Sequence, residues 1–186
     1  YAESNFFSAD QAVPPVFLGA AETGMRCVSS AMNHLRDYGY AHHIERLMIF
    51  GNLALTAGIN PQAMTEWMTA SFVDSSEWVM VPNVVGMALY ADGGSMSTKP
   101  YASGGAYINR MSDSCRTCSF NPKKRVGDDA CPFTTLYWDF LDRNRDQLSS
   151  NHRLAIQFGN LDRLNDIDQI RERAIDVRER LAIGNL

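Results

Sequence analysis

Apolar residues recur every three or four positions along much of the chain, and no stretch alternates apolar and polar residues over the length of a useful strand. This spacing predicts a helix from about Thr23 to Tyr38. A second helix is predicted from Tyr40 to about Ala57. Because that segment is apolar almost all round, we expect it to be buried.

Glycine, proline and asparagine divide the middle of the chain. Gly58 is suited to end a helix, and Asn60 followed by Pro61 is typical of an N-cap and a first helical residue, so a third helix is predicted after Pro61. Asp74 to Asn83 has no helical period and is predicted to be an irregular connection. A short helix is expected from Val84 to Tyr90.

Loops and two further helices are predicted in the second half of the chain. The glycine pairs in Asp92 to Gly94 and in Ser103 to Gly105 indicate tight turns. Pro132 to Leu148 reads as a helix, and from Asp166 onward an apolar stripe faces Arg and Glu residues on the other side. The expected fold class is all-α, with residues 1–186 forming one domain or part of one.

Four cysteines are arranged in a way that is typical of a metal site. Cys115 and Cys118 have the C-x-x-C spacing, and Cys131 follows and directly precedes Pro132. The fourth, Cys27, lies 88 residues before Cys115. A site with four thiolates would therefore fasten an early segment to the later loop.

Three kinds of cysteine site are compatible with this spacing. Disulfides need an oxidising compartment, whereas the absence of a secretory signal pattern leads us to expect a reducing one, such as the cytoplasm or a plastid. Structural zinc commonly uses two short cysteine pairs, and Cys27 stands alone. The scattered ligands and the Cys131-Pro132 pair favour an iron-sulfur cluster over zinc.

Composition limits the partners that can be expected. The formal charge is −4 with 20% charged residues, so the net charge does not support DNA binding, which would need a local basic patch. No apolar run approaches the roughly 20 residues of a membrane span. Nine methionines and 45% hydrophobic residues leave room for an interface with another protein chain.

Few other residues suggest chemistry. His42 and His43 fall on the most apolar helix, either as satisfied core residues or as groups that exchange a proton. The run Lys123 to Arg125 either contacts phosphate or forms the solvated tip of the cysteine loop. The tryptophans are mostly expected in the core, although aromatic rings can relay electrons. No Gly-rich phosphate loop and no Ser/His/Asp arrangement is present.

Four longer motifs carry a resemblance to a known family. The segments YGYAHHIERLMIFGN, EWVMVPNVVGMALYADGG, TKPYASGGAYINRMSDSC and ACPFTTLYWDFLDRNRD resemble the bacterial iron-sulfur cryptochromes and photolyases, a group that includes prokaryotic (6-4) photolyases. The resemblance implies an all-helical FAD-binding domain and light-driven DNA repair or signalling. It also implies a 4Fe-4S cluster bound by Cys27, Cys115, Cys118 and Cys131.

The resemblance assigns roles to individual residues. His43 matches the histidine that is proposed to exchange a proton with the lesion, and His42 matches its neighbour. Trp67 falls where the family has an aromatic residue for electron delivery to the flavin. Asp74 and Asn83 lie in the loop around the flavin ring, whose N3 donates and whose carbonyl oxygens accept hydrogen bonds.

Three departures from the family pattern bear on function. An acidic residue is usual at the position of Met80, and a tyrosine is common at the position of Met68. The N-terminal α/β antenna domain and the first helices of the flavin domain lie outside residues 1–186, so we expect only part of a FAD site and a partner that supplies the rest. Two functions are therefore expected: a photolyase or cryptochrome completed by an N-terminal half, or a photolyase-derived structural or electron-transfer subunit of a larger assembly that keeps the cluster.

Overall fold

The computed structural model describes all 186 residues, which form helices joined by loops with two isolated β-bridges and no sheet. The predicted all-α class is confirmed. In chain order the elements are α1 (Arg26–Tyr38), α2 (His43–Glu45), η1 (Arg46–Gly51), α3 (Asn52–Ala57), α4 (Pro61–Ser71), α5 (Glu77–Val81), η2 (Pro82–Ala88), α6 (Gly105–Met111), η3 (Ser114–Thr117), α7 (Pro132–Arg143), α8 (Arg145–Leu148), η4 (His152–Leu154), α9 (Ala155–Leu161) and α10 (Ile167–Ala182).

One continuous helix occupies the centre of the fold. It consists of α2, the π-helical turn η1 and α3, which follow one another without a break. Every residue from Leu47 to Ala57 is buried, as predicted for this segment. Its first turn is exposed, however, so His42 and His43 lie at the surface and not in the core.

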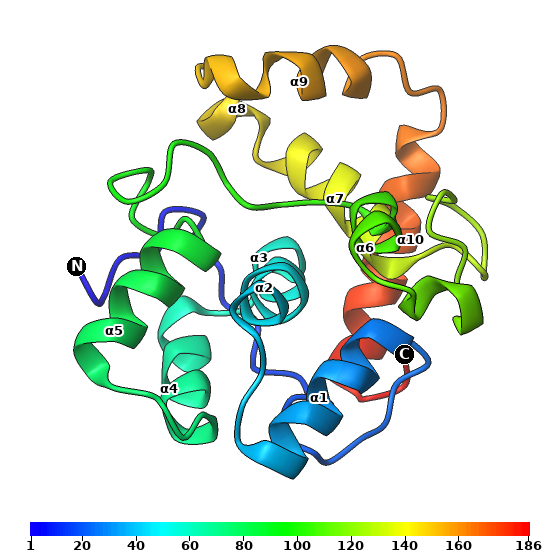
Figure 1. Ribbon diagram of the computed structural model, residues 1–186. Helices are drawn as coiled ribbons and strands as arrows, with labels where there is room; N and C mark the ends of the chain where they lie inside the picture. Colours follow the sequence, from blue (N-terminus) through cyan, green and yellow to red (C-terminus); the bar gives the residue numbers. More distant parts are fainter.

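Most of the other helices lie around this central helix, while α8 and α9 lie beyond α7 (Figure 1). α4 and α5 lie on one side of it, with α4 packed on η2 and η2 packed on η1. On the other side α7 packs against both α3 and α10. α1 contacts η1 and the cysteine segment η3, so it joins the central helix to the loop that follows α6.

A cluster of aromatic rings fills the interior beside the central helix. The Phe17 and Trp67 rings stack with their centroids 4.9 Å apart, and Phe50 meets the Trp67 ring edge-on at 5.4 Å. Phe72 closes the cluster 6.1 Å from Trp67. The Trp67 indole N–H donates to the Phe17 carbonyl oxygen at 2.9 Å, so its one polar group is satisfied inside the core.

Packing at the C-terminal end follows the predicted amphipathic pattern. α10 buries one apolar stripe against α7, formed by Ile170, Ala174, Val177 and Leu181. The predicted helix from Pro132 to Leu148 is present but is divided at Asn144, where α7 ends and α8 begins. No helix combines the length and the apolar character that crossing a membrane requires.

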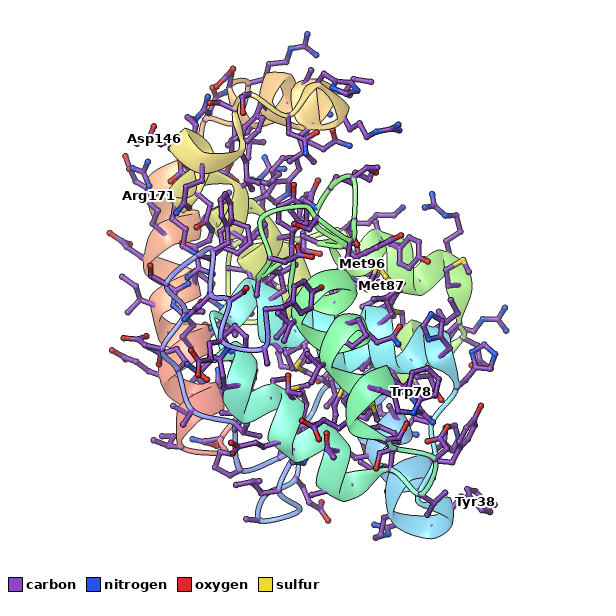
Figure 2. The ribbon with its side chains drawn as sticks, turned by 90° about the vertical axis from the view of Figure 1, so that its left-hand side faces the viewer. Tyr38, Trp78, Met87, Met96, Asp146 and Arg171 are labelled. Carbon is purple, nitrogen blue, oxygen red and sulfur yellow. The ribbon has the colours of Figure 1, made fainter.

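Some sequence-based expectations were wrong. Residues 77–83 were predicted to be irregular but form α5 and the start of η2. Pro82 is tolerated because it stands where α5 widens into a π-helical turn, so its missing N–H interrupts no regular series of α-helical hydrogen bonds. α6 was not predicted, because the glycines of Ser103 to Gly105 indicate only a tight turn. Trp78 is not a core residue, since 82% of it is exposed at the surface (Figure 2).

Close approach of the two π-helical segments requires glycine at one position. A Cβ atom added to Gly51 of η1 would lie 2.8 Å from the Cβ of Ala88 in η2. We therefore expect Gly51→Val to lower the free energy of unfolding by about 2 kcal/mol through overpacking, measured by urea denaturation followed by circular dichroism.

Gly159 of α9 is the matched control, because it has no atom within 4 Å of an added Cβ and lies in a helix. Gly159→Ala should raise stability by about 0.5 kcal/mol through helix propensity. Equal effects of the two substitutions would show that the contact between η1 and η2 is not tight.

Candidate functional site

All four cysteines line one cavity, although they come from distant parts of the chain. Cys27 lies in the first turn of α1, Cys115 lies in η3, Cys118 ends η3, and Cys131 precedes α7 as its N-cap. Met25, Ile108 and Phe120 are among the apolar residues that complete the wall. The structure thus brings Cys27 to the later loop, as a shared site requires.

Hydrogen bonds to Thr134 hold the loops around this cavity together. The Thr134 hydroxyl donates to the Pro122 carbonyl oxygen at 2.9 Å and accepts from the Gly105 N–H at 2.9 Å. Gly105 starts α6 beside Cys131, and a Cβ added to it would lie 2.7 Å from the Cys131 sulfur. Any larger residue at position 105 would therefore enter the space next to the thiols.

The protonation of the thiols reflects burial and their mutual proximity. Burial raises the pKa of Cys131 to about 11. It raises the pKa of Cys27 further, and the negative charges that Cys131, Cys118 and Cys115 would carry add to that rise. None of the four is in a disulfide. No three Cys, His, Asp or Glu side chains are grouped as ligands for a single metal ion.

A second cavity, of about 100 Å³, lies at the exposed end of the central helix. Its walls come from the first turns of that helix, from α4 and from α5 with η2. The lining residues are His43, Arg46, Leu47, Met68, Val79, Met80, Asn83, Val84 and Ala88. Met68 and Met80 are both buried.

Three of the predicted flavin-site residues lie at or beside this cavity. His43 and Asn83 line it directly, and Asp74 pairs with Arg46, whose guanidinium donates to the Asp74 carboxylate at 2.9 Å. The Asn83 amide nitrogen donates to the Val79 carbonyl oxygen at 2.7 Å, which leaves the amide oxygen without a protein partner. The cavity therefore offers an imidazole, a cation and an acceptor oxygen.

Two predicted residues lie outside the lining. His42 caps the central helix. Its ring Nδ1 accepts a hydrogen bond from the backbone N–H of Ile44 at 3.2 Å, and its backbone N–H donates to the Glu45 carboxylate at 3.0 Å. Trp67 belongs to the aromatic cluster of the core. Their predicted roles in proton exchange and electron delivery stay predictions.

Arg46 lines the cavity but was not predicted from the sequence as a site residue. It follows His43 by three positions, so both side chains lie on one face of the helix, a spacing that could have identified it. Besides pairing with Asp74, it donates to the Ala41 carbonyl oxygen at 2.7 Å and lies 4.2 Å from the centre of the Phe72 ring. Arg46 thereby joins the cavity to the aromatic cluster around Trp67.

The amino-acid sequence is similar to that of known proteins, and this similarity bears on the function of the two cavities. The chain is 52% identical over 166 residues to a (6-4) photolyase of Agrobacterium fabrum, an alignment that covers 89% of this chain and 32% of the photolyase. The chain is thus homologous to the C-terminal part of a photolyase, which supports a place in the photolyase/cryptochrome family. The resemblance to photolyases that the sequence motifs carry is confirmed, while the iron-sulfur subtype stays a prediction.

The photolyase match also limits what this chain represents. The chain spans about a third of the length of the photolyase and corresponds to its C-terminal helical part. An uncharacterized protein of Acanthamoeba polyphaga mimivirus is 31% identical over 109 residues, which are 59% of this chain and 81% of the viral protein. No protein-family model matches the chain.

The interactions of Arg46 predict its contribution to stability. Only 16% of its side chain is exposed, and substitution removes an ion pair, a backbone hydrogen bond and the contact with Phe72. We expect Arg46→Gln to lower the free energy of unfolding by about 2 kcal/mol and the melting temperature by about 5 °C.

Arg36 provides the control, since its ion pair with Asp37 is exposed on both sides. Arg36→Gln should change stability by no more than about 0.5 kcal/mol. If thermal denaturation gave the same small change for both variants, the cavity rim would not depend on Arg46.

Proposed function

We propose that this chain is the C-terminal part of a light-driven, flavin-dependent protein that repairs (6-4) photoproducts in DNA or senses blue light, completed by an N-terminal half outside residues 1–186. The observation that carries the proposal is the 52% identity to a (6-4) photolyase over 89% of the chain. The arrangement of His43, Arg46 and Asn83 around one cavity supports it.

FAD is proposed to bind with part of its ring system against this cavity. The Asn83 amide oxygen has the acceptor character that the N3 proton of a flavin needs, and Arg46 can donate to a flavin carbonyl oxygen. When bound, FAD supplies light absorption and electron transfer. Because a cavity of about 100 Å³ is smaller than the roughly 300 Å³ of an ordinary small-molecule site, the preceding part of the protein must contribute the remaining walls.

His43 is proposed to be the proton donor and acceptor for the lesion. Its exposed imidazole lies at the mouth of the cavity and has no side-chain hydrogen bond to the rest of the chain. An imidazole without a fixed partner can exchange a proton near neutral pH. His42, by contrast, is proposed to act indirectly by capping the helix that positions His43.

Trp67 is proposed to take part in electron delivery through the aromatic cluster. Its ring lies 6.1 Å from Phe72, and the Phe72 ring lies under the guanidinium of Arg46 at the cavity. This gives a contiguous path of packed side chains from the core to the cavity.

The four cysteines are proposed to bind a 4Fe-4S cluster. Around a single zinc ion, with Zn–S bonds of about 2.3 Å, four sulfurs would lie about 3.8 Å apart. In a cluster each thiolate binds a different iron atom, so the sulfurs stand further apart around a common centre. Four cysteines that line one cavity could offer one thiolate to each iron atom of such a cluster, which supports the proposal.

A second function is favoured by the methionines in the cavity. Met68 and Met80 are buried in its wall, and a thioether can neither donate nor accept a proton in catalysis. These residues favour a photolyase-derived subunit in which the cluster serves structure or electron transfer and repair activity has been lost.

The cluster proposal predicts that iron binding and folding are lost together. Cys27→Ser should reduce iron per chain, measured by elemental analysis, from four atoms toward zero and lower the helical signal on heating, because ligand loss and unfolding are coupled in such sites. Ser29→Ala on the same helix should retain the full iron content. Unchanged iron in Cys27→Ser would remove this cysteine from the ligand set.

A chimera tests the photolyase function. The C-terminal third of the Agrobacterium photolyase is replaced by this chain, and repair of an oligonucleotide carrying one (6-4) lesion is measured under blue light. The chimera should retain FAD and repair the lesion, and His43→Ala should reduce repair at least about 100-fold with FAD still bound. His152→Ala, which changes an exposed histidine of η4, is the control.

The same chimera separates the two functions. If it binds FAD but repairs nothing, and Met80→Glu introduces activity, the subunit function is supported. Failure to bind FAD in every variant would contradict the proposed flavin site.

A further inference from the structure

A third cavity, of about 160 Å³, lies apart from both sites described above. It is enclosed by the N-terminal residues 5–11, by the turn between α3 and α4, and by the facing sides of α7 and α10. Two arginines reach it, Arg143 from the end of α7 and Arg178 from the middle of α10. None of the proposed cluster or flavin residues lines it.

The N-terminal wall of this cavity is fixed by hydrogen bonds. The Asn5 side chain bonds to both the N–H and the carbonyl oxygen of Ala9, at 2.9 and 2.8 Å, which closes this segment on itself. The Gln11 N–H donates to the Gly58 carbonyl oxygen at 3.0 Å, and the Asn60 N–H donates to the Gln11 carbonyl oxygen at 2.8 Å. These hydrogen bonds hold the N-terminal wall in place, so the cavity is a defined part of the fold.

The two arginines share one buried carboxylate. Arg178 donates through one Nη to Asp139 at 2.5 Å, and the Nε of Arg143 lies 3.6 Å from the same Asp139 oxygen. Asp139 is only 5% exposed. Arg143 and Arg178 thus both face the buried carboxylate of Asp139, and the other charged side chain on the cavity lining is the exposed Asp10.

Several guanidinium N–H groups at the cavity have no partner in the protein. Arg143 uses one Nη to donate to the Thr56 carbonyl oxygen at 2.6 Å, and its other Nη makes no hydrogen bond. Arg178 uses only the Nη that contacts Asp139. Burial lowers the pKa of Arg143, and the neighbouring Arg178 lowers it further while Asp139 opposes the change.

We propose that this cavity binds the phosphate group of a small molecule between Arg143 and Arg178. Guanidinium groups match the oxygens of phosphate and carboxylate in pairs. Because the two arginines come from different helices, an anion whose oxygens do not lie in one plane suits them better than a planar carboxylate. Asp10, an exposed carboxylate on the same lining, limits the site to small anions.

Titration calorimetry with inorganic phosphate, at constant ionic strength set with chloride, tests the site. Phosphate should bind with a dissociation constant of about 1 mM or lower, and acetate should bind more weakly. Arg178→Gln and Arg143→Gln should each weaken phosphate binding at least about tenfold, since a hydrogen bond to a charged group is lost. Asp10→Asn should tighten it about threefold by removing a nearby negative charge.

Arg171→Gln is the matched control. Arg171 lies two turns before Arg178 on α10 and also pairs with a carboxylate of α7, Asp142, but at the surface and outside the cavity (Figure 2). This variant should bind phosphate within about twofold of the unchanged protein. Equal weakening in Arg171→Gln, tighter binding of acetate, or no phosphate binding to the unchanged protein would overturn the proposal.

The test remains decisive if an arginine variant fails to fold. Asp10 is exposed, so Asp10→Asn keeps the packing of α7 and α10, and an unchanged affinity in that variant would count against a phosphate site at this cavity. Circular dichroism of each variant before titration separates loss of folding from loss of binding.

Discussion

The buried amide of Asn52 connects the two halves of this fold. Asn52 is fully buried in the central helix, and its amide nitrogen donates to the Ser103 carbonyl oxygen at 2.9 Å while its amide oxygen accepts from the Ser103 N–H at 3.0 Å. Both polar ends of the side chain thus satisfy one residue of a loop 51 positions away. The Asn52 amide is fully buried and would be left without partners if Ser103 moved away, so the position of the loop depends on this side chain.

This anchor sets the geometry of the cysteine cavity. Gly105 lies two residues after Ser103, and its N–H donates to the Thr134 hydroxyl at the start of α7. Thr134 in turn donates to the Pro122 carbonyl oxygen in the cysteine loop. The same helix carries His43 and Arg46 at its other end. A single rigid element therefore fixes the cysteine cavity and the histidine cavity relative to each other, which is what electron transfer or a shared structural role would need.

The two ends of the central helix differ in how completely the chain encloses them. Around Phe50 the aromatic cluster is closed and its polar groups are satisfied, whereas the cavity at His43 is small, open and lined by two methionines. The chain spans only about a third of its photolyase relative. The cavity at His43 is open, whereas all four thiols of the cysteine cavity come from this chain.

The sequence alone determined the helical class, most helix positions and the resemblance to photolyases. Local rules were sufficient for these, since the periodic stripe of α10 and the Asn60-Pro61 start of α4 depend on residues close together in the chain. Local rules failed where packing overrode them, as in α6, whose first residue Gly105 is fixed by Thr134 from α7.

Only the tertiary structure decided which distant residues meet. C-x-x-C spacing indicated a metal site, but the approach of Cys27 to Cys131 depends on the packing of α1 against the cysteine segment. Likewise, the i,i+4 spacing of Asp139 and Arg143 on α7 is a local signal, but nothing in the local sequence around Arg178 indicates that it joins them at a cavity. Side chains separated by many turns come together through the packing of whole helices, and that packing is set by the summed burial of apolar surface and not by any short motif.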